Sequence, residues 1–209
     1  MKKVPTDQRV PRVPVTQMFV SSIGLGLLGE RARDSLMVTD EFPEAGWTMT
    51  SQVSYRTLDR INTSEEDRRA RRDGSITGRR RYLNSSSKRK LEIVVIPYTS
   101  VEDANASLQR RPELFYRSPF RRAFLLNQKV VDPATFPDLA DAVLSEAEIR
   151  NSRGISNFKF VGRSAGRLLV AMYFRAPVGS WTWNEIATIA NLQASKARPV
   201  VGGSDESGK

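Results

Sequence analysis

The sequence predicts an α+β domain with two layers, in which a mainly antiparallel sheet is packed by a long C-terminal helix. Three observations predict this class. Residues 91–96 form an apolar, β-branched run with the length of a buried strand. Residues 156–176 alternate on both sides of a turn, as a β-hairpin does. Residues 180–198 repeat apolar side chains at helical spacing.

The length of 209 residues and the hydrophobic fraction of 39% are typical of one folded domain with polar ends. We expect a leader or signal-like segment at residues 1–33, a single α+β domain at residues 34–200 and a disordered tail at residues 201–209. The domain carries a basic insertion at residues 62–90.

The leader contains the apolar run MFVSSIGLGLLG after several basic residues, which is the outline of a signal peptide. Pro11 and Pro14 are unusual in such a segment, and no A-x-A cleavage site follows. The alternative is an N-terminal helix or strand that packs on the domain. No stretch reaches the ~18 apolar residues that a transmembrane helix needs.

Residues 47–55 alternate, with Trp47 and Met49 on one face, and predict a half-buried strand. Residues 62–74 place acids before arginines and predict a short solvated helix. Residues 78–83 and 90–98 then predict two strands joined by a polar turn.

Ser100 and Asp103 predict the capped start of a short helix, which Pro112 ends. Residues 140–149 predict a strand, although a helix also fits them, and residues 155–162 predict another strand.

The hairpin is expected to turn at residues 163–166, and residues 168–174 are apolar on both faces, which predicts an internal strand. The last helix is expected to begin at Ser180, its N-cap, and to end before Pro199. Trp183, Ile186 and other apolar side chains of this helix should face the sheet.

The chain contains neither cysteine nor histidine. Disulfides, thiolate catalysis and zinc sites built on these residues are therefore excluded, as is a Ser-His-Asp triad. The absence of cysteine fits either side of a membrane, so it does not fix the compartment.

The remaining candidates for chemistry are weak. The GLGLLG run at residues 24–29 matches a dinucleotide-binding pattern, but no alternating strands and helices follow it. Glu146 and Glu148, like Asp138 and Asp141, form carboxylate pairs without a partner base or metal-binding spacing. We predict no catalytic residue, no metal site and no cofactor.

The net charge of +10 is concentrated in one segment. Residues 68–90 contain ten basic residues against one acid, Asp73, which gives +9. Along a strand, Arg79 and Arg81 should point to one face and Arg80 to the other. The candidate anion-binding residues are Arg79, Arg80, Arg81, Lys88, Arg89 and Lys90.

Such charges have two interpretations. They bind a polyanion, either nucleic acid or an anionic surface, or they are a solvated edge that keeps the sheet from pairing with other chains. We expect them to face water in either case.

Several motifs in order resemble a known family: FPEAGW, IVVIPYTSVEDANASLQ, FPDLADAVLSEAEI, VGRSAGRLLVAMYF and SWTWNEIATIANLQASKA. The pattern, over roughly residues 40–197, is similar to the extracellular sensor domains of actinobacterial serine/threonine kinases and to related cell-envelope lipoproteins. The resemblance implies a non-enzymatic α+β domain outside the cytoplasmic membrane, with a cleft between sheet and helix for an unknown ligand. The missing cysteines and the basic insertion depart from the pattern.

The first hypothesis is therefore an exported or envelope-associated sensor-like domain that binds an unknown small ligand or protein partner. The alternative is a nucleic-acid or polyanion-binding protein that acts through residues 68–90. The alternative location is the cytoplasm. A third hypothesis is a carboxylate-dependent enzyme that uses Glu146.

Overall fold

The computed structural model describes residues 32, 34–53, 78–98, 100–117, 124–151 and 154–198. The predictions for the leader, for the helix at residues 62–74 and for the C-terminal tail lie outside the described residues. Among the helices that the structure describes, none is both long and apolar enough to cross a membrane.

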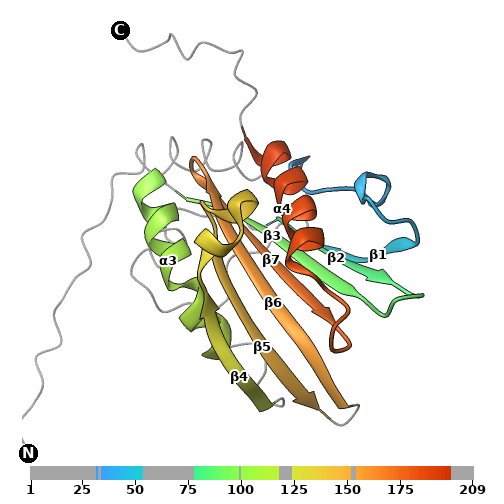
Figure 1. The fold of residues 1–209 in the computed structure, drawn as a ribbon. Helices are drawn as coiled ribbons and strands as arrows, with labels where there is room; N and C mark the ends of the chain where they lie inside the picture. Colours follow the sequence, from blue (N-terminus) through green and yellow to red (C-terminus); the bar gives the residue numbers. More distant parts are fainter. Residues whose placement is uncertain are drawn as a thin grey trace, which may run out of the picture.

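Seven strands form one sheet in which every neighbouring pair is antiparallel. The strand order is β1-β2-β3-β7-β6-β5-β4 (Figure 1). The strands are β1 (Trp47–Val53), β2 (Gly78–Asn84), β3 (Lys90–Pro97), β4 (Phe124–Val131), β5 (Val143–Asn151), β6 (Gly154–Ala165) and β7 (Leu168–Ala176).

Two helices pack on this sheet. Helix α3 (Val101–Arg117) contacts β5, β6 and β7, whereas α4 (Trp183–Ala197) contacts β6 and β7. Short 3-10 turns lie before β1 and between β4 and β5: η1 (Thr39–Glu41), η2 (Pro133–Thr135) and η3 (Pro137–Leu139). The predicted α+β class, an antiparallel sheet packed by the C-terminal helix, is confirmed.

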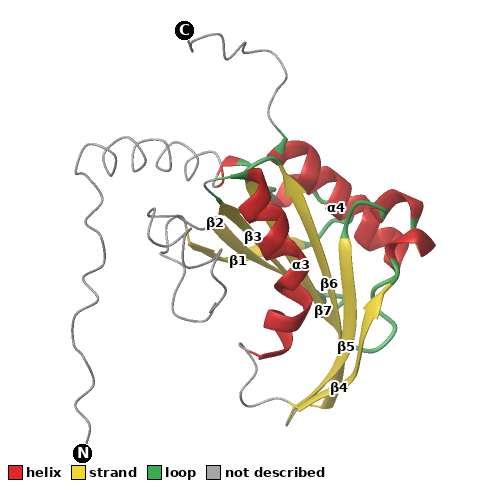
Figure 2. Cartoon of the chain, turned by 90° about the vertical axis from the view of Figure 1, so that its left-hand side faces the viewer, coloured by secondary structure: helices red, strands yellow, loops and turns green. Residues whose placement is uncertain are grey.

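The side chains of β7 alternate between two apolar cores. Val170 and Met172 belong to the core that includes Ile186 of α4, whereas Leu169 and Ala171 belong to the core beneath α3. The two helices therefore cover opposite faces of the sheet (Figure 2), which we call the α4 face and the α3 face. The prediction of two layers did not include α3 as a separate layer on the second face. The prediction that β7 is an internal strand with two apolar faces agrees with its burial.

The segment 34–46 lies on the α4 face beside α4 (Figure 1). Gln193 of α4, which is completely buried, donates from Nε2 to the Ser35 carbonyl over 2.8 Å. Its Oε1 atom accepts a hydrogen bond from the Met37 amide over 3.0 Å. Lys196 Nζ forms an ion pair with Glu41 at 2.6 Å. These contacts join the start of the described chain to its last helix.

The predicted end of the first helix is wrong. The Ser100 hydroxyl accepts a hydrogen bond from the Asp103 amide over 3.0 Å, as expected of a cap, but α3 continues through Pro112 to Arg117. Proline removes a single backbone donor from a helix and disfavours the position without forbidding it. Buried Ala104 and Leu108 already hold the preceding turns against the sheet.

The predicted cap of the last helix is also wrong, because the N-cap is Thr182 instead of Ser180. The Thr182 hydroxyl accepts from the Glu185 amide over 3.3 Å, and the Glu185 carboxylate accepts from the Thr182 amide over 2.8 Å. This reciprocal capping box begins the helix two residues later. Trp181 consequently lies before the helix and is buried.

The predicted hairpin is confirmed, but its turn is shorter than expected. Strand β6 extends to Ala165, which is opposite Leu168, so that Gly166 and Arg167 alone form the turn. Gly166 has a φ of +61°, a conformation that glycine adopts without strain. Arg163, which the prediction placed in the turn, is therefore a strand residue.

Two strands differ from expectation. Strand β4 was not predicted, because its alternation is broken where Asn127 has a φ of +50° and the register shifts between Leu126 and Lys129. In β1 the sequence predicts that Trp47 and Met49 share a buried face. Trp47 is buried, but Met49 is 48% exposed. A register shift between Met49 and Ser51 accompanies this exposure.

Candidate functional site

Strand β2 divides the predicted anion-binding residues between the two faces of the sheet. Arg80 and Tyr82 both reach the Met37 carbonyl and so lie on the α4 face. Arg79 and Arg81 both form ion pairs with Glu92 and so lie on the α3 face. The predicted alternation of the three arginines is confirmed.

Arg80 binds backbone carbonyls of the segment 34–46. Its Nη1 atom donates to the Leu36 carbonyl over 2.7 Å and to the Met37 carbonyl over 2.8 Å. The Tyr82 hydroxyl donates to the same Met37 carbonyl over 2.5 Å. Burial raises the pKa of Tyr82 to about 12, so this phenol stays a hydrogen-bond donor. Arg80 and Tyr82 thus fix the segment 34–46 to the sheet.

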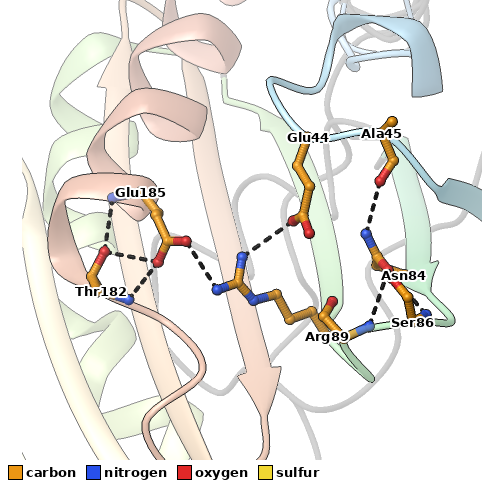
Figure 3. A network of polar contacts seen from close by, with 8 residues as sticks. Glu44, Ala45, Asn84, Ser86, Arg89, Thr182 and Glu185 are labelled. Atoms are coloured by element: carbon orange, nitrogen blue, oxygen red, sulfur yellow. Dashed lines mark hydrogen bonds and ion pairs between the residues drawn. The ribbon is translucent and has the colours of Figure 1, made fainter.

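Arg89 joins three parts of the chain (Figure 3). Its guanidinium pairs with Glu44 at 3.2 Å and with Glu185 of α4 at 2.9 Å. The same group lies 4.5 Å from the ring centroid of Trp181. Partial burial acts to raise the pKa of Glu185, but the Thr182 hydrogen bonds and Arg89 outweigh it, so the pKa is lowered.

The β2–β3 turn positions Arg89 through Asn84. The Asn84 amide nitrogen of the backbone donates to the Arg89 carbonyl over 2.9 Å. The Asn84 side chain accepts from the amides of Ser86 and Ser87, both over 3.2 Å, and donates to the Ala45 carbonyl over 3.1 Å (Figure 3). An asparagine side chain that accepts hydrogen bonds from the amides two and three residues later stabilises a turn.

Beneath Arg89 lies a chain of aromatic rings. Phe42 stacks on Trp47 with centroids 5.0 Å apart, and Trp47 stacks on Trp181 at 5.9 Å. Tyr82 and Phe174 contact the two ends of this chain edge-on, at 4.9 Å from Phe42 and 5.2 Å from Trp181 respectively.

The expectation that all the predicted basic side chains face water is wrong for Arg80 and Arg89. Arg80 donates to backbone carbonyls of the segment 34–46. Arg89 pairs with Glu44 and Glu185 and lies over the Trp181 ring.

The other basic residues lie on the α3 face of the sheet or in the β2–β3 turn. Arg81, 48% exposed, pairs with Glu92 at 2.7 Å, and Arg79 pairs with the same carboxylate at 3.6 Å. Lys90 is exposed and lies opposite Arg175 of β7, while exposed Lys88 lies in the adjoining turn. We call this set the basic face: Arg79, Arg81, Lys88, Lys90 and Arg175.

Arg163 is a polar side chain of the α4 face whose role the sequence did not reveal. It is 7% exposed, and its Nε atom donates to Asp141 over 2.8 Å. Its other nitrogens contact Asn191 of α4 and the Asp138 carbonyl. Of the predicted carboxylate pair, Asp141 contributes its side chain and Asp138 its backbone carbonyl to this contact between β6, the η3 region and α4. The sequence signal for this role was an arginine next to the apolar residues of a predicted strand.

The carboxylates of β5 are held by cross-strand partners. Glu146 pairs with Lys129 at 2.8 Å and lies 3.9 Å from Lys159, and Glu148 accepts from Asn127 over 2.9 Å. Burial lowers the pKa of Lys159, whose ammonium lies 4.7 Å from the ring centroid of Trp183. Within the described ranges, no group of three or more Asp and Glu side chains is arranged to hold a metal ion.

The fold is similar to that of a kinase extracellular domain. The structure is similar to the crystal structure of the extracellular domain of PknH from Mycobacterium tuberculosis, with a TM-score of 0.54 and 12% sequence identity. The match covers 81% of this chain and 95% of that domain. The resemblance that the sequence predicts is therefore confirmed for the fold. No protein-family model matches the sequence, and no curated protein matches it.

Proposed function

We propose that this protein is a non-enzymatic, sensor-like domain that is exported or associated with the cell envelope and binds a small ligand or a protein partner. The observation that carries the proposal is the likeness to the PknH extracellular domain, which extends over 95% of that domain. The apolar run after a basic start in residues 1–33 adds support, because it has the outline of an export signal.

The contacts of the carboxylates count against an acid-base mechanism. Glu146, the residue that an acid-base mechanism would use, is engaged by Lys129 and Lys159. The chain has no histidine or cysteine to serve as a base or nucleophile. Glu146→Gln should therefore alter stability and leave any ligand binding by the domain unchanged.

Fractionation of the native host tests the location. The protein should appear outside the cytoplasm or in the envelope fraction, and N-terminal sequencing should show whether the leader is removed. Leu27→Arg with Leu28→Arg should trap the protein in the cytoplasm, because charges interrupt the apolar run. Leu192→Arg, on the exposed side of α4, is the matched control and should leave export intact. A soluble cytoplasmic protein that retains Met1 would refute the proposal.

A further inference from the structure

We propose that Trp47, Trp181 and Arg89 form a binding site for a small, uncharged compound that carries a carbonyl oxygen. The inference rests on the proposed function and deepens it, because it gives the sensor-like domain a ligand site and states the chemistry that the ligand needs. The observation that carries it is a group of buried hydrogen-bond donors without acceptors in the described chain.

The two tryptophans are buried together with their polar atoms. Trp47 is 6% exposed and Trp181 is 4% exposed, yet neither indole Nε1 atom has a hydrogen-bond partner in the described chain. Arg89 Nε is also buried without a partner, although the other nitrogens of its guanidinium pair with carboxylates. Buried donors in folded proteins almost always have an acceptor, because an unpaired one is costly. These donors therefore indicate an acceptor that binds from outside.

The donors lie together at one end of the α4 face. The rings of Trp47 and Trp181 stack with centroids 5.9 Å apart, and the Arg89 guanidinium lies 4.5 Å from the Trp181 centroid. The buried Ser87 hydroxyl, two residues before Arg89 in the β2–β3 turn, also has no partner. We call Trp47, Ser87, Arg89 and Trp181 the donor cluster. It contains four of the five buried side-chain atoms that lack a partner among the described residues.

The chemistry of the donor cluster selects an uncharged acceptor. An indole N–H group only donates, so it gives an ammonium or guanidinium ligand nothing to bind. Glu44 and Glu185 lie 3.2 Å and 2.9 Å from the Arg89 guanidinium, so an anion there would meet two carboxylates around one cation. A carbonyl oxygen accepts two hydrogen bonds without carrying a charge. The aromatic rings beside it suit an apolar ligand body.

Arg89 controls access to the donor cluster (Figure 3). Its side chain reaches from the β2–β3 turn to Glu44 on one side and Glu185 on the other, and it covers the Trp181 ring. Both carboxylates are partly exposed, and ion pairs of this kind are individually weak. The site is closed in this structure, and a ligand reaches the indole groups when the guanidinium moves away from Trp181.

The test is titration of the isotope-labelled full chain, followed by NMR of its indole N–H signals. The chain has three tryptophans, so Trp183 provides an internal reference, since its ring packs on Phe136 instead. The probes are benzamide, benzoate and benzamidinium, which are flat compounds of similar shape with neutral, negative and positive charge.

Benzamide should shift the Trp47 and Trp181 signals saturably and leave the Trp183 signal unchanged. Its dissociation constant should be on the order of 1 mM, as is usual for so small a compound. Benzoate and benzamidinium should bind roughly 10-fold more weakly, because a charge buried without a partner is costly.

Two pairs of variants sharpen the test. Trp181→Phe removes one N–H donor and should weaken benzamide binding roughly 5- to 30-fold, whereas Trp183→Phe is the matched control and should not. Glu44→Gln loosens Arg89 and should tighten benzamide binding several-fold, since it favours the open state. Its control is Glu92→Gln, which removes a carboxylate from the α3 face and should have no effect. If Trp181→Phe does not fold, the glutamate pair replaces it, because both side chains lie partly in solvent.

Three results would overturn the proposal. Equal shifts of all three indole signals would show unspecific contact with benzamide. Magnetisation transfer from water to the Trp47 and Trp181 N–H groups, without any response to benzamide, would make an internal water the acceptor. Benzamidinium binding as tight as benzamide binding would make the carboxylates the site instead. A cytoplasmic location in the fractionation experiment would refute the proposed function and leave this measurement independent.

Discussion

Gln193 illustrates how one buried polar side chain organises a distant segment. It bonds both the Ser35 carbonyl and the Met37 amide, 158 and 156 residues away along the chain. These backbone groups lie on the α4 face, where Leu36 and Met37 are buried and water is excluded. Unpaired backbone groups in such a place are costly, so Gln193 helps to position the segment 34–46.

Gln193→Ala should lower the free energy of unfolding by about 2–4 kcal/mol, because it leaves two buried backbone groups without partners. Urea denaturation measures this loss. Leu192→Ala is the control, since Leu192 is 41% exposed on the same helix, and it should cost less than about 1 kcal/mol. Equal losses at the two positions would show that Gln193 has no special role.

Gly162 is a second residue whose importance comes from its surroundings. A Cβ atom added there would lie 2.5 Å from Leu108 Cδ1 and 2.9 Å from Phe160 Cζ. Both neighbours are buried, so neither has space to move away. The absence of a side chain at Gly162 therefore lets α3 approach β6 closely.

Gly162→Ala should lower the free energy of unfolding by about 1–3 kcal/mol through overpacking. Leu108→Ala alone should cost about 2–5 kcal/mol. In the double variant the new methyl group occupies part of the space that Leu108 leaves, so the combined loss should be smaller than the sum. Strictly additive losses in thermal unfolding would contradict the close contact.

At the scale of elements, the start of α4 depends on charge. The pKa of Glu185 is lowered in the folded protein, which means that folding stabilises its carboxylate form. This stabilisation is complete at pH values above the ordinary carboxyl pKa of 4.5 and is lost as the pH falls through the lowered value. Arg89, Thr182 and the helix dipole are the partners that lose their interaction.

Glu185→Gln should reduce the free energy of unfolding by about 0.5–1 kcal/mol at neutral pH, since the carboxylate is partly exposed. The difference from the unchanged protein should vanish in acid, where Glu185 is protonated. Denaturation at a series of pH values measures it. Glu102→Gln, an acid in the first turn of α3, serves as the control and should show a smaller difference. A constant difference at every pH would refute the charge effect.

The elements also show where sequence patterns succeed. Strands β3, β5, β6 and β7 are recognisable because regular alternation or an unbroken apolar run survives along them. Strand β4 is not, because the left-handed Asn127 interrupts its alternation. The extent of α3 is not predictable either, because tertiary packing overrides the local effect of Pro112.

For the whole molecule, the strand order predicts a gradient of stability. Within the sheet that the structure describes, strands β3, β7 and β6 each pair with two neighbours, whereas β1 and β4 are edges with one paired neighbour each. Amide hydrogen exchange should therefore be slowest in β7 and the strands beside it and fastest in β1, which also contains a bulge. Protection of β1 amides equal to that of β7 would contradict this order.

The candidate site was predicted only in part. The charge of residues 79–90 and the alternation of the arginines are properties of the local chain, and both were correctly anticipated. Arg80 and Arg89 differ from the other basic residues of this segment because they bind Met37, Glu44 and Glu185. The local sequence does not specify where these partners lie. Whether the basic face binds an anion stays a prediction.

The sequence by itself determined the α+β class, the internal strands and the concentration of positive charge, because apolar periodicity and composition are local features. Only the tertiary structure decided that α3 and α4 cover opposite faces, that the segment 34–46 lies on one of them and that two arginines hold it there. The physical reason is that buried hydrogen bonds and ion pairs join residues far apart in the chain, and their geometry exists only after the sheet has formed.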